Sequence, residues 1–242
     1  KKIYNEIQKH GSVYSWHASK RIASILIKQE KKKKAVIFLE KIFQKIKNPT
    51  TYQLFDYAEF LKNNEKYEES IKYYSKVIDK INKKHILYGQ VLDGRGVAYE
   101  RTDQWNKAET DLLNSLSVSP NDAYVINYLA YSWIEKGINV EKSLNMLKKA
   151  NILRPNDGYI IDSLGWALFK LKKYEEAKKY LQLAVRLMAS DPVVNDHYAD
   201  SLWMNNNSLQ ARYYWNYVLK LEKTEEKLKK EIEHKLLFGI KT

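Results

Sequence analysis

The feature that most constrains this chain is a helical hairpin pattern that recurs about every 34 residues. Its clearest copy occupies residues 158–187, in which the small residues Gly165 and Ala177 lie among bulky apolar residues at helical spacing. The small residue of the first helix recurs at intervals of 35, 38, 34, 35 and 34 residues, at Ala23, Ala58, Gly96, Ala130, Gly165 and Ala199. A unit this short cannot bury its apolar face alone, so the pattern predicts stacked hairpins.

Two further columns of residues follow the same period. The small position early in the second helix is Ala35, Ser70, Ala108, Ser143, Ala177 and Ala211, and the bulky position four residues later is Leu39, Tyr74, Leu112, Leu147, Leu181 and Trp215. All four prolines, at positions 49, 120, 155 and 192, lie between hairpins, where a missing N–H costs least. The sequence therefore predicts an all-α solenoid of about six helix-turn-helix repeats.

The columns also divide the chain. We expect residues 1–15 to be a remnant helix of a preceding repeat, followed by one array over 16–225 with repeats at about 16–50, 51–88, 89–122, 123–157, 158–191 and 192–225. Residues 226–242 are expected to form a C-terminal capping helix, with an apolar stripe of Leu228, Ile232, Leu236 and Leu237 that covers the last repeat. Repeat three departs from the pattern at Arg95, where a bulky apolar residue is usual.

Composition excludes several classes of function. The chain has no cysteine, which excludes disulfides and thiolate chemistry, and no apolar run approaches the roughly 18 residues that a membrane span needs. The formal net charge of +13 raises the question of nucleic acid, but almost all of the excess is lysine, with only six arginines. Because proteins that read bases and phosphates favour arginine forks, we do not favour a nucleic-acid partner.

The sequence contains no recognisable catalytic or metal-binding constellation. The five histidines, His10, His17, His85, His197 and His234, fall in different segments, and none stands four residues from another. A nucleophile elbow, a phosphate-binding glycine loop and a dinucleotide fingerprint are all missing from the sequence. We therefore predict no catalytic residues, no metal site, no cofactor and no enzyme activity.

The columns from Trp16 to Glu222 resemble the tetratricopeptide-repeat family. The match is densest in the fifth repeat, at Leu164, Gly165, Leu168, Tyr174, Ala177, Leu181 and Ala184. The resemblance implies a right-handed α-solenoid of antiparallel helix pairs that recognises a protein or a peptide. The lysine and asparagine clamp of the chaperone-binding subclass is not matched, because Lys20 and Ser24 are followed by Phe55 and Glu59 at the corresponding places.

A narrower resemblance rests on three segments, NYLAYSW at 127–133, RPNDGYIIDSLGW at 154–166 and DPVVNDH at 191–197. These are similar to the C-terminal arrays of large repeat proteins of Gram-negative bacteria, particularly alphaproteobacteria. Related members include envelope lipoproteins that act as adaptors for a carboxyl-terminal processing protease. The resemblance implies an envelope adaptor, and it favours the periplasm or envelope over the cytoplasm.

Binding on the concave surface is the predicted function, because the first helices of stacked hairpins line such a surface. The second, fifth, ninth and twelfth positions of these helices are expected to face it. In the last three repeats the predicted peptide-binding residues are Tyr124, Asn127, Tyr131, Tyr159, Asp162, Trp166, Phe169, Asp196, Asp200 and Trp203. Aromatic rings offer contact area at low entropic cost, and the carboxylates would select a neutral or basic ligand.

Other interpretations stay open at this point. The aromatic residues of the first helices could instead pack between neighbouring repeats. A function of another class is a basic surface that binds nucleic acid or an anionic envelope polymer through lysines of the convex face. Self-association through the ends of the array is a third, and neither the oligomeric state nor the identity of a partner follows from the residues.

Overall fold

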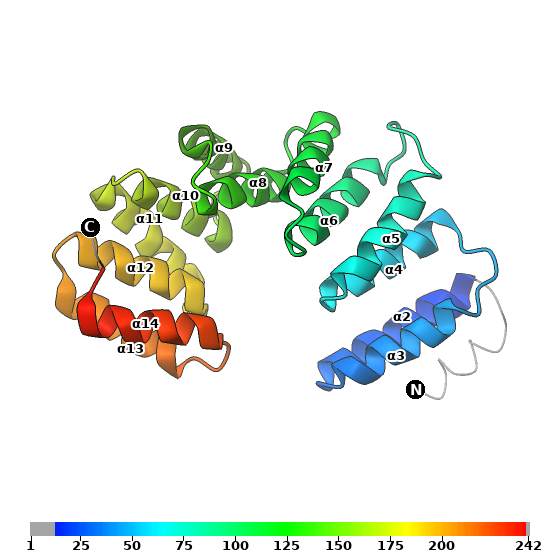
Figure 1. Cartoon of the computed structure of the whole chain (residues 1–242), viewed down its shortest axis with the longest axis horizontal. Helices are drawn as coiled ribbons and strands as arrows, with labels where there is room; N and C mark the ends of the chain where they lie inside the picture. Colours follow the sequence, from blue (N-terminus) through cyan, green and yellow to red (C-terminus); the bar gives the residue numbers. More distant parts are fainter. Residues whose placement is uncertain (1–12, 241–242) are drawn as a thin grey trace. The chain divides into compact units, whose positions relative to one another are not determined.

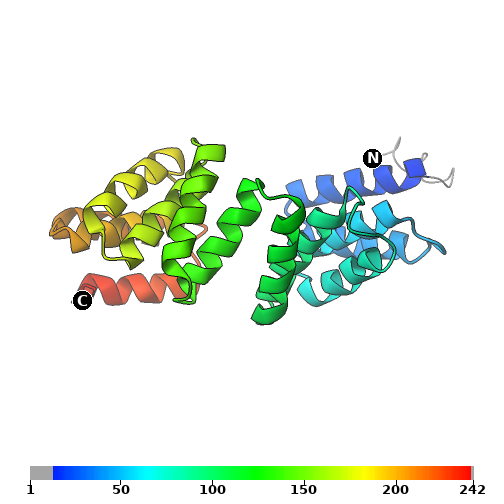
Figure 2. The ribbon, with the colours of Figure 1, turned by 90° about the horizontal axis from the view of Figure 1, so that it is seen from above.

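The computed structural model describes residues 13–240 of the chain, and in this range it consists of thirteen helices and no strands (Figures 1 and 2). The helices are α2 (Val13–Lys28), α3 (Lys32–Phe43), α4 (Thr51–Asn63), α5 (Tyr67–Ile78), α6 (Tyr88–Glu100), α7 (Trp105–Val118), α8 (Ala123–Glu135), α9 (Val140–Leu153), α10 (Gly158–Lys170), α11 (Tyr174–Leu187), α12 (Pro192–Met204), α13 (Ser208–Lys220) and α14 (Glu226–Phe238). The predicted all-α fold of six hairpins and a C-terminal helix is confirmed. Most of the predicted remnant helix at 1–15 lies outside the described residues, and α2 begins three residues before Trp16.

The helices form two compact units, and the chain passes from one to the other between Ser119 and Pro120. The first unit contains α2 to α7, and the second contains α8 to α14. Within each unit, consecutive hairpins pack side by side, as Figure 1 shows for α4 to α7 and for α8 to α11. None of the described helices is long and apolar enough to cross a membrane.

Each hairpin turns through one residue with left-handed backbone geometry. These residues have φ between 50° and 64° and are Glu30, Glu65, Asp103, Asn139, Lys172 and Asn206. None of them is glycine, which is the residue that adopts this conformation at least cost. The fourth hairpin, between α8 and α9, also has Gly137 at φ 68°, which accommodates the extra residue of its turn.

Aspartates fix the start of every first helix in the second unit. The side chains of Asp122, Asp157 and Asp191 each accept hydrogen bonds from two backbone N–H groups at the starts of α8, α10 and α12. Such a cap contributes about 1 kcal/mol of stability and removes two unpaired donors. Because the three helices begin at equivalent positions, their second, fifth and ninth residues fall at equivalent places in consecutive repeats.

The small-residue columns mark the closest approach of the two helices in a hairpin. A Cβ atom added at Gly165 would lie 2.7 Å from Cγ of Leu181, and one added at Gly96 would lie 2.9 Å from Cγ of Leu112. The alanines of the same column, such as Ala130 and Ala199, are fully buried. Leucines of the second helices therefore fill the space that the small residues leave open.

The C-terminal helix α14 packs against the apolar core of the second unit. Ile232 is fully buried, and Leu228 and Leu236 are partly buried against the same core. Leu237, which we expected in this stripe, is 74% exposed instead. The Leu237 side chain lies on the side of α14 that faces away from α12 and α13. The buried stripe therefore consists of Leu228, Ile232 and Leu236.

The exception at Arg95 is explained by a buried ion pair. Its guanidinium donates to both carboxylate oxygens of Asp111 on α7, at 2.6 and 3.0 Å, and to Oγ of Ser75 on α5 at 3.1 Å. The side chains of Arg95 and Asp111 are 16% and 7% exposed. Burial alone would lower the pKa of Arg95, but the Asp111 carboxylate raises it above the usual value, so the guanidinium stays charged.

We expect the substitution Asp111→Ala to lower the free energy of unfolding by about 3 kcal/mol, because it leaves the Arg95 guanidinium buried without its partner. The double variant Arg95→Met, Asp111→Leu should recover most of that loss, because it removes both charges together. Urea denaturation measures both, with the exposed Asn114→Ala on the same helix as control. A double variant no more stable than Asp111→Ala would contradict this account.

Candidate functional site

A hollow of about 250 Å³ opens on the first helices of the second unit, α8, α10 and α12. It is lined by Asn127, Tyr128, Tyr131, Tyr159, Asp162, Ser163, Asp191, Val193 and Val194. Four of the ten residues predicted from the sequence to bind a peptide are in this lining. They come from the second, fifth and ninth positions of their helices, so the equivalent helix starts bring them together.

Exposed apolar side chains occupy the second position of each of these helices. The exposed fractions are 55% for Tyr124, 56% for Tyr159 and 44% for Val193. The Tyr124 ring lies under the guanidinium of Arg154, 5.6 Å from the ring centre, and so already binds a cation within the chain. For Tyr159, partial burial and then the nearby Asp191 carboxylate raise the pKa of the hydroxyl, which therefore stays protonated at neutral pH.

The wall of the hollow contains a hydrogen-bond acceptor without a partner. Oδ1 of Asn127 is shielded from solvent and accepts no hydrogen bond from the described part of the chain. Buried polar atoms are nearly always paired in native proteins, and an unpaired acceptor costs free energy. Because no solvent reaches this oxygen, a ligand can donate to it only after the side chains that cover it have moved.

Asp162 lines the hollow, but its carboxylate is paired within the chain. Nδ1 of His197, on α12, lies 3.1 and 3.0 Å from the two oxygens of Asp162, and both residues are 5% exposed. Burial alone would lower the pKa of His197, but the Asp162 carboxylate, followed by Asp196 and Asp200, raises it above the usual value. Asp162 and His197 therefore form a buried ion pair that joins two consecutive repeats.

Trp166 and Phe169 form an aromatic stack with His197. The Trp166 ring lies 3.9 Å from the His197 ring at 11° and 4.8 Å from the Phe169 ring at 7°. Nε1 of Trp166 donates to Oε1 of Glu135 on α8 at 2.6 Å, and Trp166 is only 8% exposed. The structure thus places Trp166 between neighbouring first helices, the alternative that the sequence left open for these aromatic residues.

Asp196 and Asp200 are also paired, with a lysine of the C-terminal helix. Nζ of Lys235 lies 2.8 Å from both oxygens of each carboxylate, and the two aspartates are 6% and 5% exposed. Nε1 of Trp215 donates a further hydrogen bond to Asp200 at 3.0 Å. Burial and then the Asp196 carboxylate raise the pKa of Asp200 to about 7, whereas Lys235 opposes that rise.

The segment after α14 covers the last predicted residue, Trp203. A Cβ atom at Gly239 would collide with the Trp203 ring, and Gly239 has φ 69°, a conformation that suits glycine. The Arg212 guanidinium lies 5.4 Å from the centre of the same ring. Trp203 is therefore only partly exposed, beneath the C-terminal segment of the second unit.

Sequence reasoning missed His197 and Lys235, which hold the three predicted aspartates. A signal for Lys235 was present, because it follows Ile232 by three residues and Leu228 by seven and so lies on the apolar side of α14. For His197, the signal was its distance of 35 residues from Asp162, one repeat along the chain. Within the described residues, no group of three or more histidine, aspartate and glutamate side chains could hold a metal ion.

Comparison with known proteins agrees with this architecture. A sequence model described as a tetratricopeptide repeat matches residues 25–224. A TPR repeat-containing protein of Pseudomonas aeruginosa is 26% identical over 136 residues, which make up 53% of this chain and 21% of that protein. The chain thus spans about a fifth of the length of this curated relative.

Solved structures share the fold at low sequence identity. A thermophilic TPR protein of Thermus thermophilus is 14% identical, with a TM-score of 0.64 over 78% of this chain and all of that chain (100%). MamA of Desulfovibrio magneticus RS-1 is 15% identical, with a TM-score of 0.60 over 75% of this chain and 99% of that chain. These similarities establish the fold.

We expect Lys235→Met to lower the free energy of unfolding by about 3 kcal/mol, because it leaves two buried carboxylates without a cation. Lys229→Met on the same helix is the control, since Lys229 pairs with the exposed Glu226 alone among the described residues and its loss should cost less than about 1 kcal/mol. Urea denaturation at pH 7 measures both variants. Equal losses would show that Lys235 does not hold α14 in place.

The His197–Asp162 pair also predicts a dependence of stability on pH. Because folding raises the pKa of His197, its stabilising contribution is complete below about pH 6.5 and is lost as the pH rises through the higher pKa of the folded state. The free energy of unfolding should therefore fall between about pH 6 and 9 more steeply in the wild type than in His197→Gln. Proton NMR of the imidazole gives the pKa directly, and a midpoint at or below about 6.5 would contradict the ion pair.

Proposed function

This chain belongs to the tetratricopeptide-repeat family, and on that premise we propose that it is a non-catalytic scaffold that binds a peptide segment of another protein on the first helices of its second unit. Stacked repeats of this kind form the extended concave surfaces on which repeat proteins bind their partners. The proposed site is the hollow between α8, α10 and α12 together with the exposed rings beside it.

The observation that carries this proposal is the hollow itself, in which side chains of three consecutive first helices meet beside the exposed ring of Tyr159. An apolar side chain of an extended peptide can enter the hollow beside Tyr131 and Tyr159. Tyrosine rings suit this task because they bury a large area and lose little side-chain entropy. The exposed Tyr124 and Val193 extend the contact surface along the equivalent positions of the neighbouring helices.

The buried ion pairs bear on which peptide fits. Asp162, Asp196 and Asp200 are already paired with His197 and Lys235. A basic ligand would have to displace these partners to reach those three carboxylates, and the Asp191 side chain already accepts the N–H groups at the start of α12. This supports a neutral peptide segment over a basic one.

The wider role we propose is that of an adaptor in the bacterial envelope, which brings a bound protein to another component. This part rests on the resemblance of the segments at 127–133, 154–166 and 191–197 to arrays of envelope repeat proteins. The chain matches only part of its curated relative, so regions outside the array would contribute further contacts in such a protein.

The test compares Tyr159→Ala with Tyr213→Ala in quantitative pull-downs from the source cells. Tyr159 lines the hollow, whereas Tyr213 is 67% exposed on the second helix α13, outside the hollow. We expect Tyr159→Ala to reduce recovery of the bound protein by about tenfold, the effect of truncating a central aromatic contact, and Tyr213→Ala to retain it. Asn127→Ala should weaken the same interaction.

If both tyrosine variants retained the same partners, the hollow would not be the binding site. Binding that falls steeply with salt and equally in wild type and Tyr159→Ala would instead support adhesion of an anionic polymer to surface lysines.

A further inference from the structure

The first unit contains a second hollow, beside an aromatic cluster that joins its first two hairpins. The cluster consists of Trp16, Phe43, Tyr57 and Tyr73. Phe43 at the end of α3 stacks on Tyr57 of α4, with ring centres 4.1 Å apart at 12°. Tyr73 of α5 meets both rings edge-on, at 5.3 and 4.8 Å. Two of these rings, Phe43 and Tyr73, border an open space between the repeats.

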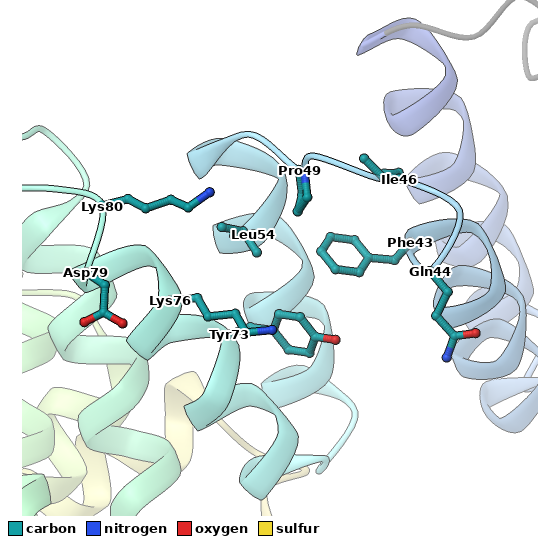
Figure 3. A pocket seen from close by; sticks show the side chains of 9 residues that line it. All are labelled: Phe43, Gln44, Ile46, Pro49, Leu54, Tyr73, Lys76, Asp79 and Lys80. Atoms are coloured by element: carbon teal, nitrogen blue, oxygen red, sulfur yellow. The ribbon is translucent and has the colours of Figure 1, made fainter.

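That space is a hollow of about 390 Å³ with an apolar floor and a basic rim, shown in Figure 3. Its lining consists of Phe43, Gln44, Ile46, Pro49, Leu54, Tyr73, Lys76, Asp79 and Lys80. The apolar members come from α3, α4, α5 and the connection between α3 and α4, so the floor depends on how two repeats pack together. Its volume lies within the usual range of small ligand sites and is sufficient for one large side chain with its flanking backbone.

The rim of the hollow has a net positive charge, from Lys76 and Lys80 against Asp79. Lys76 and Lys80 form no ion pair with any described residue, and Lys76 lies over the Tyr73 ring, 4.9 Å from its centre. In Figure 3 the amino groups of both lysines extend toward the apolar side chains, whereas the Asp79 carboxylate points away from them. The lining thus has two lysines and one aspartate, whereas burial, then Glu40 and then Glu69 raise the pKa of Tyr73, so two further carboxylates lie near that ring. Lys76 and Lys80 are both exposed at the edge of the apolar floor, where a carboxylate of a ligand can reach their amino groups.

We propose that this hollow, defined by Phe43, Leu54, Tyr73, Lys76 and Lys80, is a docking site for an acidic peptide segment. An aromatic or large aliphatic side chain of that segment enters between the rings and Leu54. A neighbouring carboxylate of the same segment lies between the amino groups of Lys76 and Lys80. Charge complementarity selects this occupant, because both lysines lack an anionic partner within the described chain.

Nucleic acid fits this hollow less well. A base would need an open ring face on which to stack, but Phe43 is only 6% exposed and Tyr73 already has Lys76 over its ring. An aromatic or branched aliphatic side chain needs only a closed apolar floor. The proposed occupant therefore differs in charge from the neutral peptide proposed for the second unit, and the two sites can be tested separately.

The experiment selects a displayed library of random seven-residue peptides against the full chain carrying Tyr159→Ala, which removes the site proposed in the second unit. We expect enriched peptides to combine an aromatic or large aliphatic residue with at least one Asp or Glu. For an enriched peptide, the double substitution Lys76→Glu, Lys80→Glu should weaken binding about tenfold or more. Lys72→Glu is the matched control, because Lys72 lies on the same helix as Lys76 and does not line the hollow, and it should change affinity less than about twofold.

An exchange of charges between the chain and the peptide shows whether the double variant has lost binding through its charges or because it no longer folds. Changing the acidic residues of the enriched peptide to lysine should restore binding to Lys76→Glu, Lys80→Glu and abolish binding to the wild-type lysines. Three results would overturn the proposal: enriched peptides without acidic residues, equal effects of Lys72→Glu and the double substitution, or stronger competition by single-stranded RNA or anionic vesicles than by the free peptide.

Discussion

The fold depends on the close approach of the two helices in each hairpin at the small-residue columns. At Gly165 there is no room for a Cβ atom, because Leu181 of the facing helix fills that place. A bulkier residue would force the helices apart, and the next hairpin would lose the surface on which it packs. Since each hairpin buries its apolar face only against its neighbours, this local contact sets the position of every first helix in its unit.

The second unit combines that apolar packing with charges that are almost completely buried. Burying a carboxylate is costly unless a cation and further hydrogen bonds compensate, and here His197 compensates Asp162 while Lys235 compensates Asp196 and Asp200. Both arrangements join segments more than thirty residues apart, one between consecutive first helices and the other between α12 and α14. The charges therefore hold the end of the array together and leave the tyrosine-lined hollow as the open part of this surface.

The two units offer ligands different chemistry because their repeats are joined differently. In the second unit, capped first helices begin at equivalent positions and present tyrosine rings beside an unpaired amide oxygen. In the first unit, an aromatic cluster joins α3, α4 and α5 beside an apolar floor bordered by two lysines without an ion-pair partner among the described residues. Under the two proposals, one chain would bind two different peptide segments, as the proposed adaptor role requires.

The sequence alone determined the helices, their hairpin pairing and the positions of closest contact, because a period of about 34 residues carries that information redundantly in several columns. It also identified Asn127, Tyr131, Tyr159 and Asp162, which lie together at one hollow. Only the tertiary structure decided which polar groups are free. Helical periodicity reports the face on which a residue lies, but Asp196, Asp200 and Trp203 share their face with a helix about forty residues further along the chain. Whether these carboxylates are open to a ligand or paired with Lys235 depends on how that distant helix packs. The spacing of residues within α12 does not contain this information.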